Sequence, residues 1–317
     1  MELSSNFGDR FAGSISEHKA ANWLTSQYEQ LGFTVKQYEF TFVHNGKTLK
    51  SSNIAVELTG TSAETLVIGA HYDSISHPNG STGFLDNASG TISLLGLAKK
   101  LKEKKHHYTI LLVSFGAEEV GLHGSKHYVS SSEVDKSNLV GMINLDTVIG
   151  GDLLYIHSAH STPYTCKDIN DVKYTSNSWL RDALLLQSKK LDSVNIYKMH
   201  PANNSYPQGE TADWSDHAPF SCIGLPIAYI EATNFSIDGE AGYDGYSQTI
   251  NPRFWSCIDN EKKTACNKSK EAYWGKIWHT KFDQKKYFIP KLEDHIKSQF
   301  ESNIELLSQF ILNHNAK

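Results

Sequence analysis

The sequence predicts an α/β protein, a three-layer sandwich in which helices cover both faces of a central mixed, mostly parallel sheet. Two observations predict this class. Three runs of apolar residues, 65–70, 109–115 and 139–145, have the length of strands that are buried on both faces. Segments with apolar residues at helical spacing separate the runs, and strands that alternate with helices typically build a parallel sheet.

The other elements are predicted in chain order. Helical spacing over 14–33 predicts a first helix, with Gly32 as its stop. Alternating apolar and polar residues over 35–42 and 52–58 predict two strands, which are joined by a turn at Asn45 and Gly46. Further helices are expected over 88–104, 124–131, 176–191 and 291–313, and a further strand over 226–231.

The length of 317 residues allows one large domain or two small ones. The sequence contains no repeat and no low-complexity linker, so we expect a single domain over 1–317. One segment, about 232–276, is rich in Gly, Tyr and Asn and has no clear periodicity. Long loops in compact domains are usually functional, and we therefore expect this segment to form a wall of the binding site.

The composition excludes several classes of function. With 30 basic and 35 acidic residues, the formal charge is −5, whereas a nucleic-acid binder needs a basic face. No apolar run approaches the roughly 20 residues of a membrane helix. We therefore expect no nucleic-acid partner and no membrane partner, and we expect a monomer.

The four cysteines, Cys166, Cys222, Cys257 and Cys266, contain no CxxC pair, which argues against a zinc ribbon. Cys257 and Cys266 lie nine positions apart, where a disulfide would close a short loop and contribute about 2–3 kcal/mol. We expect this bond, and hence a secreted or periplasmic protein whose signal peptide has been removed. The alternative is four unpaired thiols in a cytosolic enzyme, and the pairing of Cys166 with Cys222 stays open.

Acidic and imidazole residues follow the ends of the buried strands, which is where α/β proteins gather their ligands. His71 and Asp73 follow the first strand, Glu118 and Glu119 the second, and Asp146 the third. Each has an ordinary structural alternative, such as a hydrogen-bonded histidine or a solvated surface carboxylate. Together, however, three successive strand ends bring metal-competent groups to one edge of the sheet.

Two further candidate ligands are Asp86, in a polar loop before a predicted helix, and His279, near the end of the chain. The alternative role of Asp86 is to cap that helix. The candidate ligand set contains nitrogen and carboxylate donors without sulfur, which suits zinc in an open catalytic site: His71, Asp86, Glu119, Asp146 and His279. Five ligands are too many for one tetrahedral ion that keeps a position for water, and they fit two Zn²⁺ ions that share one bridging carboxylate.

Two acidic residues in this group have other predicted roles. Asp73 is a natural acceptor for the second ring nitrogen of a ligating histidine. Glu118 is adjacent to a ligand and could take a proton from a metal-bound water and deliver it to a leaving amine. Its alternative role is that of a solvent-facing neighbour.

Five motifs follow one another in order between residues 65 and 283. They are His71-Tyr-Asp73-Ser, Asp86-Asn-Ala-Ser-Gly, Gly116-Ala-Glu118-Glu119-Val-Gly-Leu-His-Gly-Ser, Asn144-Leu-Asp146 and His279-Thr-x-x-Asp283. This succession resembles the M28 family of zinc aminopeptidases. The resemblance implies that His71, Asp86 and Asp146 hold one zinc ion. It also implies that Asp86, Glu119 and His279 hold the other, with Asp86 bridging and Glu118 as the general base.

Three later motifs are similar to the alkaline phosphatase isozyme conversion aminopeptidases within that family: 143–155, Asn204-Ser-Tyr-Pro207 and Glu231-Ala-Thr-Asn234. This similarity implies an exported enzyme that removes a basic N-terminal residue from peptides or proteins. A pocket for such a residue needs an acid without a compensating charge. The available acids are Asp213, Glu231, Asp238, Glu240 and Asp244.

The sequence departs from the family pattern before its last histidine. Some members have a tyrosine there that stabilises the oxyanion, whereas this chain has Trp278. If the stabiliser of this chain is a phenol, the candidates are Tyr229, Tyr243 and Tyr246. The expected substrate-binding residues are Asp216, Trp278, Glu231, Tyr243 and Tyr246.

Two alternatives to an aminopeptidase remain. Trp278-His279, together with Ser215-Asp216-His217-Ala-Pro-Phe220, also resembles the related glutaminyl cyclases, which are single-zinc acyltransferases. The second alternative is a non-catalytic peptidase-like binding domain. It is disfavoured because such relatives tend to lose ligands, and none is missing here.

Overall fold

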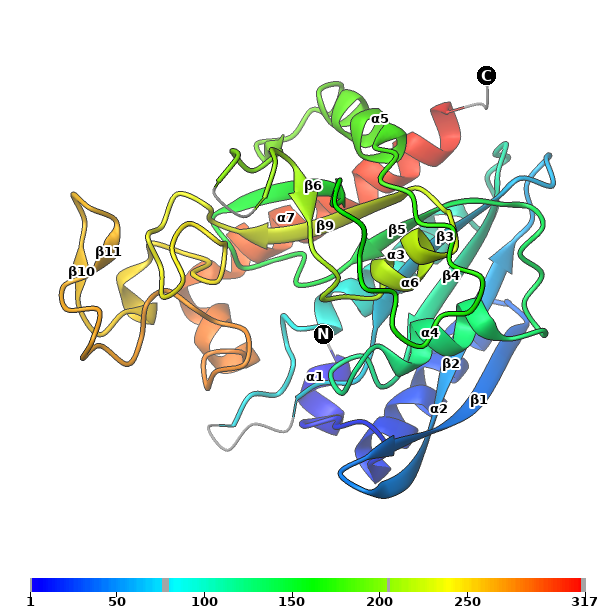
Figure 1. Ribbon diagram of the computed structural model, residues 1–317, viewed down its shortest axis with the longest axis horizontal. Coiled ribbons are helices and arrows are strands. Elements are labelled where there is room, and N and C mark those ends of the chain that lie inside the picture. The colour runs from blue at the N-terminus through cyan, green and yellow to red at the C-terminus, as the bar shows by residue number, and fades with distance from the viewer. Residues whose placement is uncertain (1, 76–79, 204–205, 315–317) are drawn as a thin grey trace.

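The computed structural model describes residues 2–75, 80–203 and 206–314, and its centre is a mixed sheet of nine strands (Figure 1). The strand order is β1-β2-β4-β3-β5-β9-β6-β7, and β8 pairs with β6. Strands β4, β3, β5 and β9 form a parallel centre. The strands are β1 (Val35–His44), β2 (Lys47–Leu58), β3 (Thr65–His71), β4 (Thr109–Phe115), β5 (Leu139–Leu145), β6 (Leu153–Ala159), β7 (Tyr197–Lys198), β8 (Glu210–Thr211) and β9 (Ile227–Thr233).

Helices cover both faces of this sheet, which confirms the predicted class. The helices are α1 (Glu2–Phe7), α2 (Ile15–Gln30), α3 (Ala88–Leu101), α4 (His123–Ser130), α5 (Trp179–Ser188), α6 (His217–Cys222) and α7 (Lys285–Asn313). Alternate residues of β3 point to opposite layers, as the pleat of a strand requires. Leu66 and Ile68 pack in the core that contains residues of α2, α3, α5 and α7, whereas Val67 packs with residues of α4 and α6. Figure 1 shows α4 and α6 in front of the sheet and α7 behind it.

Every predicted helix and strand is present. Strands β4 and β5 have the predicted ends, whereas the ends of the other predicted elements are shifted. Helix α7 begins at Lys285 instead of 291, although Pro290 lies inside it. Its first turn is anchored because Phe288 is buried and stacks on Phe84 and Phe254, with ring centroids 5.6 Å apart in both pairs. Strand β6 was not predicted, and it pairs antiparallel with β9. The expectation of a single domain stays a prediction.

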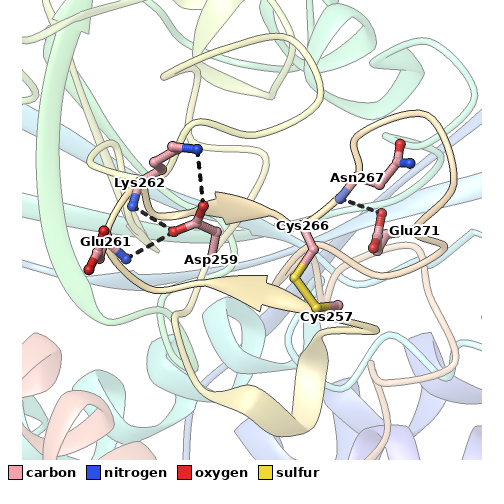
Figure 2. The surroundings of a disulfide bond; sticks show 7 residues. All are labelled: Cys257, Asp259, Glu261, Lys262, Cys266, Asn267 and Glu271. Atoms are coloured by element: carbon pink, nitrogen blue, oxygen red, sulfur yellow. Dashed lines mark hydrogen bonds and ion pairs between the residues drawn. A yellow bond between two sulfur atoms is a disulfide. The ribbon is translucent and has the colours of Figure 1, made fainter.

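Two disulfides join segments outside the sheet. Cys257 and Cys266 form the expected bond across a small hairpin of β10 (Ile258–Asp259) and β11 (Thr264–Ala265), shown in Figure 2. At its tip, the Asp259 carboxylate accepts the backbone N–H groups of the second and third residues after it. Cys166 pairs with Cys222 of α6, which closes a loop of 56 residues. No helix within the described ranges is long and apolar enough to cross a membrane.

A buried arginine fastens the N-terminal segment to the loops after β3. The Arg10 guanidinium is fully buried and donates to the carbonyl oxygens of Tyr72 (2.6 Å), Thr82 (2.9 Å) and Gly83 (2.9 Å). The Asp283 carboxylate accepts the N–H of Leu85 at 2.6 Å. These contacts fix the loop that ends at Asp86 and precedes α3.

Candidate active site

The five candidate ligands meet at the carboxyl edge of the parallel strands. His71 ends β3, Glu119 follows β4, Asp146 follows β5, Asp86 precedes α3 and His279 precedes α7. One donor atom each of His71, Asp86 and Asp146 lies within 4.8 Å of the other two, and the same holds for Asp86, Glu119 and His279. The fold therefore brings together two groups of three donors that share Asp86.

Asp86 faces both histidines. Its Oδ1 lies 3.2 Å from His71 Nε2, and its Oδ2 lies 3.2 Å from His279 Nε2. Because each carboxylate oxygen points to a different imidazole, this side chain can ligate two ions at once.

The spacing of the donor atoms fits zinc. Bonds of about 2.0–2.1 Å at tetrahedral angles place neighbouring ligand atoms about 3.3 Å apart. Besides the two contacts of Asp86, His71 Nε2 lies 3.4 Å from Asp146 Oδ1, and His279 Nε2 lies 3.0 Å from Glu119 Oε2. Two triads of nitrogen and oxygen donors at this spacing suit two Zn²⁺ ions, each with a coordination position left over.

Residues around the ligands fix their orientation. Asp73 Oδ1 lies 3.5 Å from His71 Nδ1, and the same carboxylate accepts the N–H groups of Glu118 (3.0 Å) and Glu119 (3.2 Å). Ser215 donates its hydroxyl to Asp146 Oδ2 at 2.8 Å. The sequence analysis included Ser215 only as part of a motif and did not predict this contact. A serine 69 positions from its partner gives no local signal in the sequence.

The last ligand is held by the long segment before it. His279 has a backbone φ of +57°, which is unusual for a residue with a side chain. Gln248, fully buried, accepts the N–H groups of Ile277 at 3.0 Å and Trp278 at 2.9 Å through its Oε1 atom. Sequence reasoning missed Gln248 because the segment around it has no periodicity.

Burial and crowding shift the acid–base equilibria of the metal-free site. Burial raises the pKa of Glu118 well above its usual value, although the nearby His71 opposes this shift. Burial, together with the charge of Asp86, raises the pKa of Glu119 to about 7. Burial disfavours the charged form of His279, but hydrogen bonds and charges of Asp86 and Glu119 outweigh it and raise the pKa of His279 to about 10. The site thus favours added positive charge, and a divalent cation supplies it.

The cluster opens into a cavity of about 240 Å³. Of the expected substrate-binding residues, Glu231, Tyr246 and Trp278 line this cavity, and Tyr243 and Asp216 do not. Tyr243 is exposed to solvent, whereas Asp216 is fully buried, and burial raises the pKa of Asp216 to about 7.

The remaining candidates for substrate contact divide in the same way. Tyr229 and Asp244 line the cavity, whereas Asp213, Asp238 and Glu240 do not. Asp238 instead forms an ion pair with a lysine at 2.7 Å. The motif from Asn204 to Pro207 is described only in part, since Asn204 and Ser205 lie outside the described residues.

Glu231 has a buried partner on the neighbouring strand. Its Oε1 lies 2.8 Å from Nε2 of His157, which is 1 % exposed. Burial lowers the pKa of His157, and this outweighs the opposing effect of Glu231, so that the imidazole is neutral at pH 7. Glu231 is therefore an acidic side chain of the cavity wall whose neighbouring histidine carries no compensating charge.

Comparison with known protein families identifies one match over most of the chain. The family model of peptidase family M28 matches residues 53–302. The alkaline phosphatase isozyme conversion protein of Escherichia coli is 26 % identical over 268 residues, which cover 78 % of this chain and 74 % of that protein. Aminopeptidase YwaD of Bacillus subtilis is 41 % identical over 88 residues, which cover 27 % of this chain and 18 % of that protein.

Solved structures of two kinds of enzyme share the fold. A zinc aminopeptidase from Bacillus subtilis superimposes with a TM-score of 0.66 at 16 % identity, covering 100 % of this chain and 94 % of that one. The glutaminyl cyclase of Porphyromonas gingivalis gives 0.63 at 19 % identity, covering 98 % and 94 %. At these identities the similarity establishes the fold and leaves the reaction to be argued from the site.

Zinc binding to the metal-free chain is expected to release protons, because imidazole ligates zinc only in its neutral form. The pKa of His279 is raised to about 10, and carboxylates of Glu118 and Asp146 raise the pKa of His71 well above its usual value despite burial. Both side chains thus hold a proton at neutral pH, and the apparent affinity for zinc should rise with pH. Calorimetry in buffers of different ionisation enthalpy measures the release. His279→Ala should release fewer protons, and a binding enthalpy that does not depend on the buffer would contradict this ligand set.

Proposed function

The chain belongs to peptidase family M28 and is a zinc-dependent hydrolase, and from this premise we propose that it is an aminopeptidase with two zinc ions and Glu118 as general base. The observation that carries the proposal is the geometry of Asp86, whose two oxygens each lie 3.2 Å from a different imidazole. The first ion would be held by His71, Asp86 and Asp146. The second would be held by Asp86, Glu119 and His279.

Glu118 is well placed to move the proton. Its Oε2 lies 3.9 Å from His71 Nε2, near the ligands without belonging to either triad, and it lines the cavity. When bound, the two ions polarise the scissile carbonyl and lower the pKa of the attacking water. Glu118 takes the proton of that water and delivers it to the leaving amine. The hydrogen bond from its N–H to Asp73 fixes its backbone during both transfers.

The charge of the cavity favours a cationic substrate end. One zinc ion, helped by nearby carboxylates, would anchor the free α-amine, which restricts cleavage to the first residue of a peptide or protein. Glu231 and Asp244 line the same cavity outside the metal triads. We propose that Glu231, next to the neutral His157, receives the side chain of a first Lys or Arg residue.

Glutaminyl cyclisation is the second candidate. Trp278 and His279, whose motif resembles the glutaminyl cyclases, both line the cavity, and a glutaminyl cyclase shares the fold. A single zinc ion, however, would need only one of the two Asp86 oxygens, whereas two ions would use both. The geometry of Asp86 therefore favours the peptidase.

We propose further that the protein is exported, secreted or periplasmic, and monomeric. Two disulfides, Cys166–Cys222 and Cys257–Cys266, support this location, since such bonds persist in oxidising compartments.

Glu118→Gln is expected to lower kcat by about 10²–10⁴-fold, because the amide cannot accept the proton of the attacking water. Metal analysis of the same variant should still find close to two zinc ions per chain, since the ligands are untouched. His279→Ala is the matched control, and it should lose one ion. Full turnover by Glu118→Gln would remove this residue from the mechanism.

A panel of aminoacyl amides tests the side-chain preference. The parent enzyme should release Lys and Arg fastest. Glu231→Gln should lower kcat/KM for these two by about 10–100-fold, because a charge-assisted hydrogen bond contributes about 1.5–3 kcal/mol. The same variant should leave the Leu amide unchanged. Preferred release of Leu or Phe would contradict the basic pocket, and pyroglutamate from a glutaminyl substrate would favour the cyclase.

A further inference from the structure

Glu17, in the first turn of α2, is a buried carboxylate that the mechanism above does not use. It is 0 % exposed and lies 100 positions before the residue that it contacts near the site. Ser14 and Glu17 have the spacing of a capping box, in which the glutamate normally returns to the N–H of the capping residue. Ser14 does accept the N–H of Glu17, at 3.1 Å.

The Glu17 carboxylate makes contacts that a cap does not require. Its Oε2 accepts the N–H of Gly13 at 2.5 Å. Its Oε1 contacts two residues outside the helix: it accepts the hydroxyl of Ser51 at 2.6 Å and the N–H of Ala117 at 3.2 Å. Burying a carboxyl group costs free energy unless hydrogen bonds compensate it. An exposed glutamate could cap the helix equally well. The burial of Glu17 is therefore better explained by its hydrogen bond with Ala117.

The backbone of Ala117 is strained, so that contacts from other parts of the chain must stabilise its conformation. Its φ is +55°, in the left-handed region that residues with a β-carbon rarely adopt. Strained backbone of this kind persists only when the surrounding structure determines it. The next residue is Glu118, so the conformation of Ala117 sets the direction in which the Glu118 side chain leaves the backbone.

Buried side chains hold four consecutive amides of this loop. Asn53 of β2 accepts the N–H of Gly116 at 3.2 Å, and Glu17 accepts that of Ala117. Asp73 accepts the N–H groups of both Glu118 and Glu119. Asp73 also contacts a candidate metal ligand, whereas the hydrogen bond of Glu17 goes to the backbone of the loop.

We propose that Glu17 is a positioning residue for the reaction, which fixes the direction of Glu118 through the N–H of Ala117. The inference rests on the proposed role of Glu118 as general base. A misplacement of a reacting group by about 1 Å costs about 10²-fold in rate, which sets the scale of the effect.

The test compares Glu17→Met, which keeps the length of the side chain but removes the acceptor, with Glu17→Gln, which keeps an oxygen that can face Ala117. Hydrolysis of the best aminoacyl amide by the full chain, with zinc bound, is the assay. Glu17→Met should lower kcat about 10–100-fold with KM and zinc content unchanged, and Glu17→Gln should recover most of kcat. If Glu17→Met does not fold, Glu17→Asp withdraws the carboxylate by one methylene and should show the same loss.

Leu24→Ala is the matched control, because Leu24 is buried on the same helix and belongs to a hydrophobic cluster that does not include Ala117. It should lower the melting temperature and leave kcat unchanged. Equal losses of kcat in Leu24→Ala and Glu17→Met would reduce Glu17 to a structural role and overturn the inference.

A double variant separates this inference from the proposed function. In the Glu118→Gln background, Glu17→Met should have no further effect on the residual rate, because Glu17 acts through Glu118. If Glu118→Gln is inactive and Glu17→Met is fully active, the inference alone is wrong. If Glu118→Gln keeps full turnover, the proposed function is wrong, and the inference is wrong with it.

Discussion

Asp86, Glu118, Glu119 and Asp146 line one cavity, and their four side chains are largely buried. Their mutual repulsion is strong at this depth, and it is the constraint to which the surrounding structure responds. In the metal-free chain, the carboxylates hold the pKa of His71 and His279 above the usual value, against the effect of burial. Divalent cations relieve the same repulsion with more charge. Burying a cluster of this kind costs free energy on folding, and the same cluster binds divalent cations favourably.

The fold keeps the cluster in place by anchoring the backbone around it with residues from distant parts of the chain. Arg10 donates to the loops at Tyr72 and Gly83, and Asp283 accepts the N–H of Leu85. Gln248 holds the turn that presents His279. These anchors are themselves fully buried, so that each depends on complete folding of its neighbours. The site and the hydrophobic core are therefore expected to lose their order together.

How much the sequence predicts depends on whether the signal is local. The runs at 109–115 and 139–145 are continuous and apolar, and the structure places β4 and β5 over the same residues. His71, Glu119 and Asp146 end or follow parallel strands, so the sheet topology brings these three near one another. Asp86 and His279 come instead from loops before α3 and α7, and the contacts of those loops decide where they lie. Ser215, Gln248 and Glu17 escaped sequence reasoning because their roles depend on partners 69, 29 and 100 positions away. Strand β6 was not predicted because Leu153–Ala159 neither alternates apolar with polar residues nor forms a fully apolar run. Its antiparallel pairing with β9 stabilises the extended conformation instead.

The proposed function depends on Asp86 bridging two zinc ions. Crystals of the zinc-loaded protein, measured with X-rays at the absorption edge of zinc, test it most directly, because anomalous scattering locates each ion. We expect two peaks, each about 2.0–2.2 Å from a different oxygen of Asp86, one beside His71 and the other beside His279. A single peak, or a second peak away from Asp86, would contradict it.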